Sequence, residues 1–231
     1  MTAIKHIHLE NCLSTQDEMK NFLKNTSDEF IAISTARQDE GRGRRDNKWL
    51  KIGDQIALSL AIKPHSTLTL TPLEIALLVC DFFQQEFKTT LKLKWPNDLL
   101  NYDHEKVGGI LCEVHQSLII TGIGINLYAD HCHLNLDYPV GFVLTKEYLQ
   151  NIQDLNHRLA KFIFVNRIKS SHDLISRWNQ RCVHLNRIVL IQDNDKEFIG
   201  TFLGIGDNGE AIIDMNGKEF KVFTGSLRIN H

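Results

Sequence analysis

Apolar and polar residues alternate in several stretches of the first half of the chain, and these stretches are rich in β-branched residues. Alternation with a period of two residues is the pattern of a half-buried strand. The sequence therefore predicts strands near Phe30 to Ala36, Gln55 to Ile62, Leu91 to Trp95, Val107 to Val114 and Leu118 to Leu127.

Two segments, one before the first of these strands and one between the second and third, have helical apolar spacing and start signals. "STQDEMKNFL" begins with Ser14 and has Asp17 three residues later, which predicts a side-chain cap. "TPLEIALLVCDFFQQEF" has Thr71 at its start, Pro72 in its first turn and Glu74 at the third position, so a capped, buried helix is expected here.

The pattern changes twice in the second half of the chain. From Thr145 to about Arg181 the apolar spacing is helical, and after Asn186 it alternates again. The last segment contains Asn208-Gly209 and Asn216-Gly217, each predicted to be a two-residue hairpin connection. It is predicted to form a small barrel-like β-domain.

The order of these elements predicts an α+β fold. We expect a central mixed β-sheet with helices packed on one side, followed by the small β-domain. The predicted domains are residues 1–183 and 184–231. A chain of 231 residues is long enough for this arrangement without a metal or disulfide staple.

Charge and cysteine usage limit the function classes. The chain has 26 Lys and Arg against 28 Asp and Glu, a net charge of −2, so any anion binding must be local and a nucleic-acid coat protein is disfavoured. Five scattered cysteines without a CxxC pair suggest neither a disulfide framework nor a zinc ribbon. We expect a cytoplasmic protein, since neither a signal peptide nor a membrane span is apparent.

A basic loop, "EGRGRRDNKW" at residues 40–49, stands out from this balance. Gly41 and Gly43 allow a tight turn that presents backbone N–H groups, while Arg42, Arg44 and Arg45 offer forked donors to phosphate or carboxylate. The loop is predicted to hold a polyanion. An exposed basic hairpin and an RG-type contact with nucleic acid are the alternatives.

A second motif, "LKLKWPNDLL" at residues 91–100, follows a predicted strand. Pro96 fixes a chain reversal from which Asn97 and Asp98 project, and the carboxylate could bind magnesium or a ribose hydroxyl. An ordinary type I turn with an Asn-Asp cap is the alternative.

A third motif combines "EKVGGILCEV" with "GIGINL". Glycines in strands mark close backbone approach, so Gly108, Gly109, Gly122 and Gly124 could leave room for a flat ligand. Lys106 would add a mobile charge beside it, although a lysine before Gly-Gly can also be a solvated turn residue.

Taken in order, these segments resemble the biotin protein ligase family along essentially the whole chain. The matching segments are Ser14-Thr15, Gln38 followed by "GRGRR", Trp49, "KWPND", "K-x-GGIL-x-E", "GIGIN" and a C-terminal part with the placement of the family's SH3-like β-barrel. The resemblance implies the class II synthetase-like biotin/lipoate ligase fold.

The resemblance also implies a two-step reaction that uses ATP, Mg²⁺ and biotin. The biotin carboxylate attacks the α-phosphate of MgATP, which gives biotinyl-5′-AMP and pyrophosphate. A lysine of the biotin carboxyl carrier protein of acetyl-CoA carboxylase, or of a related carboxylase, then takes the biotin. Fixed positive charge would lower the cost of bringing the two anions together.

Roles for individual residues follow from the same resemblance. Those implied to bind biotin are Ser14, Thr15, Gln38, Gly41, Arg42, Lys106 and Gly108. Those implied to bind ATP or the adenylate are Arg42, Arg44, Arg45, Trp49, Asn97, Asp98, Lys106 and Asn126. Lys106, Arg44 and Arg42 would be catalytic, and Asp98 would contact magnesium.

Several alternatives stay open at this point. A lipoate or octanoate ligase or transferase has a related fold, and a nucleic-acid-binding module would use the basic loop differently. His131, Cys132 and His133 could bind a metal or form a polar surface loop, and the same choice applies to His6 and His8. The Ser-Thr motif begins at position 14, so we expect a monofunctional enzyme without an N-terminal DNA-binding domain. A homodimer is possible.

One position departs from the family pattern, because Asp46 stands where the family commonly has glycine after "GRGRR". Aspartate is less permissive than glycine and adds a negative charge near the phosphates. We expect Asp46→Gly to slow escape of the adenylate, measured as its dissociation rate. An unchanged rate would refute this hypothesis.

Overall fold

The computed structural model describes residues 4–26, 30–45, 47–129, 139–146, 151–193 and 196–229. Asp46 and the predicted metal alternative at residues 131–133 lie outside these ranges. The elements, in chain order, are β1 (Lys5–Cys12), α1 (Thr15–Leu23), β2 (Ile31–Gln38), β3 (Gly41–Arg42), β4 (Lys48–Trp49), β5 (Asp54–Ile62), η1 (Leu68–Leu70), α2 (Thr71–Phe87), β6 (Lys92–Lys94), β7 (Asp98–Leu100), β8 (Lys106–His115), β9 (Leu118–Tyr128), α3 (Ile152–Val165), α4 (Ser171–Arg181), β10 (Ile188–Asp193), β11 (Lys196–Ile205), β12 (Ala211–Met215), β13 (Lys218–Val222) and β14 (Ser226–Ile229).

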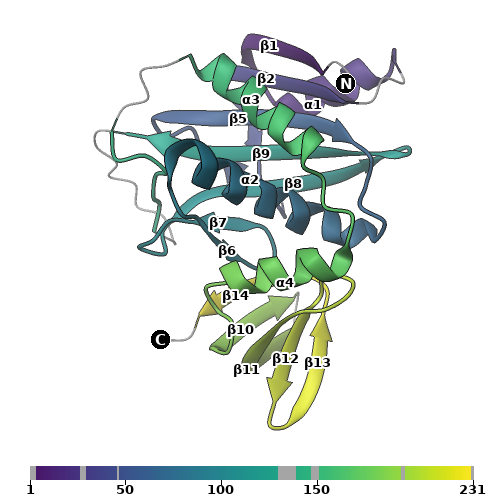
Figure 1. Ribbon diagram of the computed structural model, residues 1–231, viewed down its shortest axis with the longest axis vertical. Coiled ribbons are helices and arrows are strands. Elements are labelled where there is room, and N and C mark those ends of the chain that lie inside the picture. Colours follow the sequence, from purple (N-terminus) through teal and green to yellow (C-terminus); the bar gives the residue numbers. More distant parts are fainter. Residues whose placement is uncertain are drawn as a thin grey trace.

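The central sheet has seven strands in the order β1-β2-β5-β9-β8-β7-β6 (Figure 1). Strands β1 and β2 are parallel, and the other neighbours are antiparallel. The predicted mixed sheet is thus confirmed, and each of the five predicted strands corresponds to an observed one.

Helices cover both faces of this sheet, so the prediction that they pack on one side was wrong. Helices α2 and α3 pack on one face, while α1 packs on the other (Figure 1). Met19 of α1 belongs there to a separate apolar cluster with Ile31 and Ile33. The reason is visible in β5, whose residues after Asp54 are all buried. A strand that is apolar on both faces needs a cover on both.

The predicted side-chain caps of the first two helices were also wrong. Within the described part of the chain, Ser14 makes no capping hydrogen bond with its side chain, and α2 takes Leu70 as its N-cap. The Thr71 hydroxyl oxygen instead accepts the backbone N–H of His65 at 3.0 Å. Thr71 therefore binds the backbone of a preceding loop residue and does not cap its helix.

The predicted helical stretch from Thr145 to Arg181 contains two helices, α3 and α4. Here the caps are made by side chains, since Asn151 and Ser170 each accept a backbone N–H from the first turn. Residues 147–150 lie outside the described ranges.

The C-terminal segment forms a five-stranded antiparallel sheet in the order β13-β12-β11-β10-β14. Within its described residues, no ladder joins the edge strands β13 and β14, so the pairing does not close a barrel. Asn216-Gly217 is the two-residue turn that was predicted, with Met215 paired to Lys218. Asn208-Gly209 is part of a longer loop, because the Gly206 N–H reaches the carbonyl of Glu210 at 2.9 Å.

This second sheet lies against the β6 end of the first one, below α4 in Figure 1. The indole N–H of Trp95 donates to the Gly209 carbonyl at 3.0 Å, and the Asn179 side chain accepts the Ile205 N–H at 3.1 Å. His184 is fully buried here against Phe202, and burial lowers its pKa to about 3. The apolar core is continuous across the contact.

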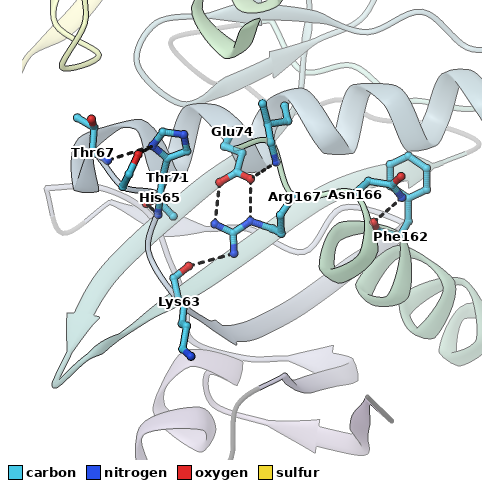
Figure 2. A network of polar contacts seen from close by, with 10 residues as sticks. Lys63, His65, Thr67, Thr71, Glu74, Phe162, Asn166 and Arg167 are labelled. Carbon is cyan, nitrogen blue, oxygen red and sulfur yellow. Dashed lines mark hydrogen bonds and ion pairs between the residues drawn. The ribbon is translucent and has the colours of Figure 1, made fainter. Parts of the chain in front are cut away.

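A buried ion pair joins three segments of the chain (Figure 2). Glu74 of α2 has no exposed surface, and both of its carboxylate oxygens accept from the Arg167 guanidinium at 2.7 Å. Arg167 also donates to the Lys63 carbonyl at 3.0 Å, and the Ile168 N–H donates to Glu74 at 2.7 Å. The pair therefore links α2, the end of β5 and the connection from α3 to α4.

None of the helices in the described ranges is long and apolar enough to cross a membrane. The described cysteines, Cys12, Cys80, Cys112 and Cys182, form no disulfide among themselves. Burial raises the pKa of the Cys80 and Cys112 thiols to about 12, so both stay protonated.

Arg167→Met tests the ion pair. Because the Glu74 carboxylate would remain buried without its partner, we expect a loss of about 3–5 kcal/mol in the free energy of unfolding. Urea denaturation measures it. The double variant Glu74→Met/Arg167→Met should recover much of the loss, and additive losses from the two single variants would contradict the argument.

Candidate functional site

The site face of the central sheet is a floor of small residues on three adjacent strands. Ala57 of β5 pairs with Gly124 of β9, which pairs with Gly109 of β8. In the next row, Ser59 pairs with Gly122. The residues between them on β5 and β9 point into the core on the opposite face. The floor lies on the same side of the sheet as α1.

The hairpin of β3 and β4 reaches over this floor. Gly41 pairs with Trp49 and Arg42 with Lys48. A Cβ atom on Gly124 would lie 2.7 Å from the Trp49 ring, and one on Gly109 would lie 3.8 Å from it. The indole therefore rests on two of the predicted glycines.

The other two predicted glycines have different surroundings. A Cβ on Gly122 would meet the side chain of Gln16 at 3.1 Å, whereas one on Gly108 would meet Leu99 and Ile125. Gly108, predicted to bind biotin, thus turns its side-chain position toward the core, and Gly109 faces the site. The pairing of β8 with β9 sets these directions, since Gly108 pairs with the core residue Ile125 and Gly109 pairs with Gly124.

An uncharged polar cluster stands at the α1 end of the floor. The Gln38 side-chain oxygen accepts from the backbone N–H of Thr15 at 2.9 Å and from its hydroxyl at 3.2 Å. The Ser59 hydroxyl donates to the Thr15 hydroxyl at 2.9 Å. Ser14 is also buried beside them, at 3% exposure. The structure thus brings together the three uncharged side chains predicted to bind biotin.

Ser59 and Gln16 were not predicted, although both belong to this end of the floor. Gln16 is buried, and its amide donates to the Leu111 carbonyl at 3.2 Å. Gln16 could have been identified from the sequence by its position directly after Ser14-Thr15.

A cationic cluster stands at the β7 end of the floor, around one carboxylate. Lys106 forms an ion pair with Asp98 at 2.7 Å, and the Lys94 amine lies 4.0 Å from the same carboxylate. Burial lowers the pKa of Lys94. Lys94 was quoted in the motif but not predicted as a site residue.

Arg44 connects this cluster to the basic loop and to the C-terminal sheet. Its guanidinium donates to the Asn97 side-chain oxygen at 3.2 Å and to the Gly225 carbonyl at 3.3 Å. Burial and the neighbouring Arg45 lower its pKa, while Asp98 and Asp193 raise it. The Asn97 amide is fixed in turn, since it donates to the Ile110 carbonyl at 2.9 Å.

The turn that carries Asn97 has a cis peptide bond between Trp95 and Pro96. Lys94 pairs with Asp98 across it, which leaves a three-residue loop.

The other two arginines of the loop point away from this cluster. Arg42 forms an ion pair with Asp17 of α1, and Arg45 forms one with Asp193 of β10 at 3.4 Å. In this structure the predicted catalytic residues Arg44 and Lys106 flank the same Asn97-Asp98 segment, and Arg42 lies elsewhere.

The loop borders an open cavity of about 1030 Å³. Its lining includes Gln38, Gly41, Arg44, Trp49 and Leu111. A cavity of this size accommodates two small molecules or one extended one.

Metal binding has limited support among the described residues. They contain no group of three or more His, Cys, Asp or Glu placed to hold a metal ion. His6 and His8 both hydrogen-bond with the Ser34 hydroxyl, at 2.8 and 2.9 Å. Asp98 and the Asn97 side-chain oxygen are hard oxygen donors of the kind that suits Mg²⁺.

Gly124→Ala tests the position of the indole. The added methyl group would lie 2.7 Å from the Trp49 ring, so we expect the ring to move off the floor and become accessible to a collisional quencher. Gly109→Ala has only ordinary contacts and should leave Trp49 fluorescence as it is. Equal quenching of both variants and the parent protein would contradict this placement.

Comparisons with known proteins bear on this site. The chain is 27% identical over 199 residues to the bifunctional ligase/repressor BirA of Escherichia coli, and this match covers 78% of the chain and 60% of BirA. The chain therefore spans less than two thirds of that curated relative.

Two solved structures share the fold. A biotin protein ligase from Aquifex aeolicus in complex with biotin and ATP has a TM-score of 0.85 and 24% identity, and the match covers 98% of this chain and 99% of that one. The biotin acetyl coenzyme A carboxylase synthetase from Helicobacter pylori has a TM-score of 0.71 and 23% identity, over 95% of this chain and 100% of that one. Residues 11–130, more than half of the chain, match the biotin/lipoate A/B protein ligase family, and the protein belongs to that family.

Proposed function

We propose that the protein is an ATP-dependent biotin protein ligase. The observation that carries the proposal is the pairing of two unlike ends on one glycine floor. Thr15, Gln38 and Ser59 offer uncharged hydrogen-bonding groups at one end, and Arg44, Lys94 and Lys106 offer positive charge at the other. A neutral polar ring system with a carboxylate tail suits the first end, and a triphosphate suits the second.

In the first step the biotin carboxylate attacks the α-phosphate of ATP and pyrophosphate leaves. Lys106 and Arg44 stabilise the negative charge of the carboxylate and the α-phosphate in the transition state. Asp98 keeps the Lys106 amine in position. Asp98 and Asn97 would hold Mg²⁺, which supplies charge neutralisation on the phosphates.

In the second step the amine of an acceptor lysine attacks the mixed anhydride and AMP leaves. No side chain of this protein has to act as a strong nucleophile, so catalysis is mainly positioning and charge stabilisation. The acceptor is the biotin carboxyl carrier protein of acetyl-CoA carboxylase or a related carboxylase, in the cytoplasm.

The domain assignment is part of the same proposal. Residues 1–183 form the catalytic domain, and residues 184–231 form an SH3-like β-domain. The contact from Arg44 to the Gly225 carbonyl supports a role for the second domain in holding the phosphate end.

Exchange of labelled pyrophosphate into ATP tests the function, with biotin, lipoate or octanoate supplied in turn. We expect exchange with biotin only. Lys106→Ala should reduce it by about 100-fold or more, because a charged donor at the reacting phosphate is lost. Lys218→Ala, on an exposed position of β13, is the control.

Each acid gives a distinct result. Exchange driven by lipoate or octanoate would assign the protein to the lipoyl branch of the family. Absence of exchange with all three acids would reject a ligase activity of this kind.

A further inference from the structure

The side chain of Arg42 lies away from the cationic cluster, and the proposed mechanism gives it no part. Its guanidinium forms an ion pair with Asp17, in the first turn of α1, and the two side chains are 42% and 41% exposed. The carboxylate that meets this arginine therefore comes from the protein itself, at a position outside the Asn97-Asp98 segment.

This ion pair belongs to a chain of four alternating charges. The Lys20 amine of α1 lies 3.9 Å from the Asp17 carboxylate and forms a second ion pair with Glu113 of β8. Arg42 and Glu113 both line the cavity that the basic loop borders. The four side chains therefore connect the β3-β4 hairpin to α1, and α1 to one strand of the floor.

The same part of the hairpin packs against the uncharged polar cluster. A Cβ atom on Gly41 would lie 2.6 Å from the Gln38 amide nitrogen, so the backbone of β3 rests directly on that side chain. Thr15, whose N–H donates to Gln38, lies two residues before Asp17 in α1. A shift of β3 relative to α1 would therefore disturb the group of side chains proposed to bind biotin.

The backbone of Arg42 is directed away from β4. The Gly43 N–H donates to the Asn47 carbonyl at 2.6 Å, and pairs in an antiparallel ladder alternate between bonded and non-bonded. The preceding pair, Arg42 with Lys48, is thus one whose N–H and C=O groups point outward. The contact with Asp17 fixes the residue that carries this outward N–H.

We propose that Asp17 is a positioning residue for biotin, which holds Arg42 and thereby keeps the β3 backbone beside the uncharged polar cluster. This inference rests on the proposed function and gives Arg42 a different part from the catalytic one that the family resemblance implies. Arg44 and Lys106 remain to act on the phosphates. Because the ion pair is partly exposed, its contribution is modest and weakens with salt.

Asp17→Asn tests the proposal, because asparagine keeps the shape of the side chain without its charge. We expect the Kd for biotin, measured by calorimetric titration, to rise about 3- to 5-fold, as for loss of a partly exposed ion pair. The difference from the parent protein should shrink at about 1 M salt, where exposed charges are screened. Asp17→Glu should retain most of the affinity. Asp173→Asn, which removes a partly exposed ion pair with Arg177 in α4, is the matched control and should leave the Kd unchanged.

A double-mutant cycle separates positioning from direct contact with the substrate. If Arg42 acts through Asp17, Arg42→Gln should raise the Kd as Asp17→Asn does, and the double variant should resemble either single variant. If the Arg42 side chain acted on the reacting groups, Arg42→Gln would lower kcat in the exchange reaction about 100-fold and Asp17→Asn would not. That result, or additive effects of the two substitutions on the Kd, would overturn the positioning role.

Trypsin gives a readout that needs no ligand. The basic loop contains several Arg and Lys residues, and cleavage of a folded protein follows the local opening of the segment. We expect Asp17→Asn to be cleaved within the loop about 3- to 5-fold faster than the parent protein, and Asp173→Asn to be cleaved at the parent rate.

The outcomes separate this inference from the proposed function. If biotin drives no exchange but Asp17→Asn still binds biotin more weakly and is cleaved faster, the ligase proposal fails and the role of Asp17 is supported. An unchanged Kd, or a raised Kd without faster cleavage, would overturn the inference. A parent protein that binds no biotin would overturn both proposals.

Discussion

The absence of side chains at Gly109 and Gly124, on neighbouring strands, is the constraint on which the rest of the site depends. Any larger residue at position 124 would collide with Trp49. Glycine weakens a strand because it brings no side chain to pack. Here the opposite face compensates, since Ile123 and Ile125 of β9 are buried in the main core. The sheet therefore carries large apolar side chains on its core face and almost none on its site face.

Three basic side chains meet at one end of this floor. A chain with a net charge of −2 cannot attract a polyanion by its overall field. Arg44, Lys94 and Lys106 instead converge on the segment that contains Asn97 and Asp98, and each keeps a carboxylate or carbonyl nearby. The Gly225 carbonyl contributes to this arrangement, which gives the C-terminal sheet a direct connection to the site.

Alternation and helical spacing predicted the strands and helices of this fold well, because each element buries a face. The position of α1 could not be predicted, since β5 is apolar on both faces and its pattern does not say which helix covers which. Thr71 and Glu74 had the local features of a cap, but their partners, His65 and Arg167, are distant or belong to another element. Local rules fail where such contacts compete for the same atoms.

The same limit applies to the site. Motifs identified the loop, the turn and the glycines, whereas the direction of Gly108 depends on its pairing with Ile125 across β8 and β9, which no short pattern reveals. Ser59 had no signal at all, because a serine within an apolar strand is unremarkable until its hydrogen bond to Thr15 is known.

The buried carboxylate of Glu74 shows how this fold pairs a charge in its interior. Glu74 is as buried as any core residue, yet both its oxygens are fully paired with Arg167 and Ile168. Removal of either partner would leave the other buried and unpaired, so the segment that carries Arg167 stays against α2. Consistency between local chemistry and fold is the rule in native proteins, and departures from it concentrate where a ligand completes the structure. Within the described residues, unpaired buried atoms also occur at His184 and Asn156, so pairing identifies structural contacts such as that of Glu74 rather than the position of a ligand.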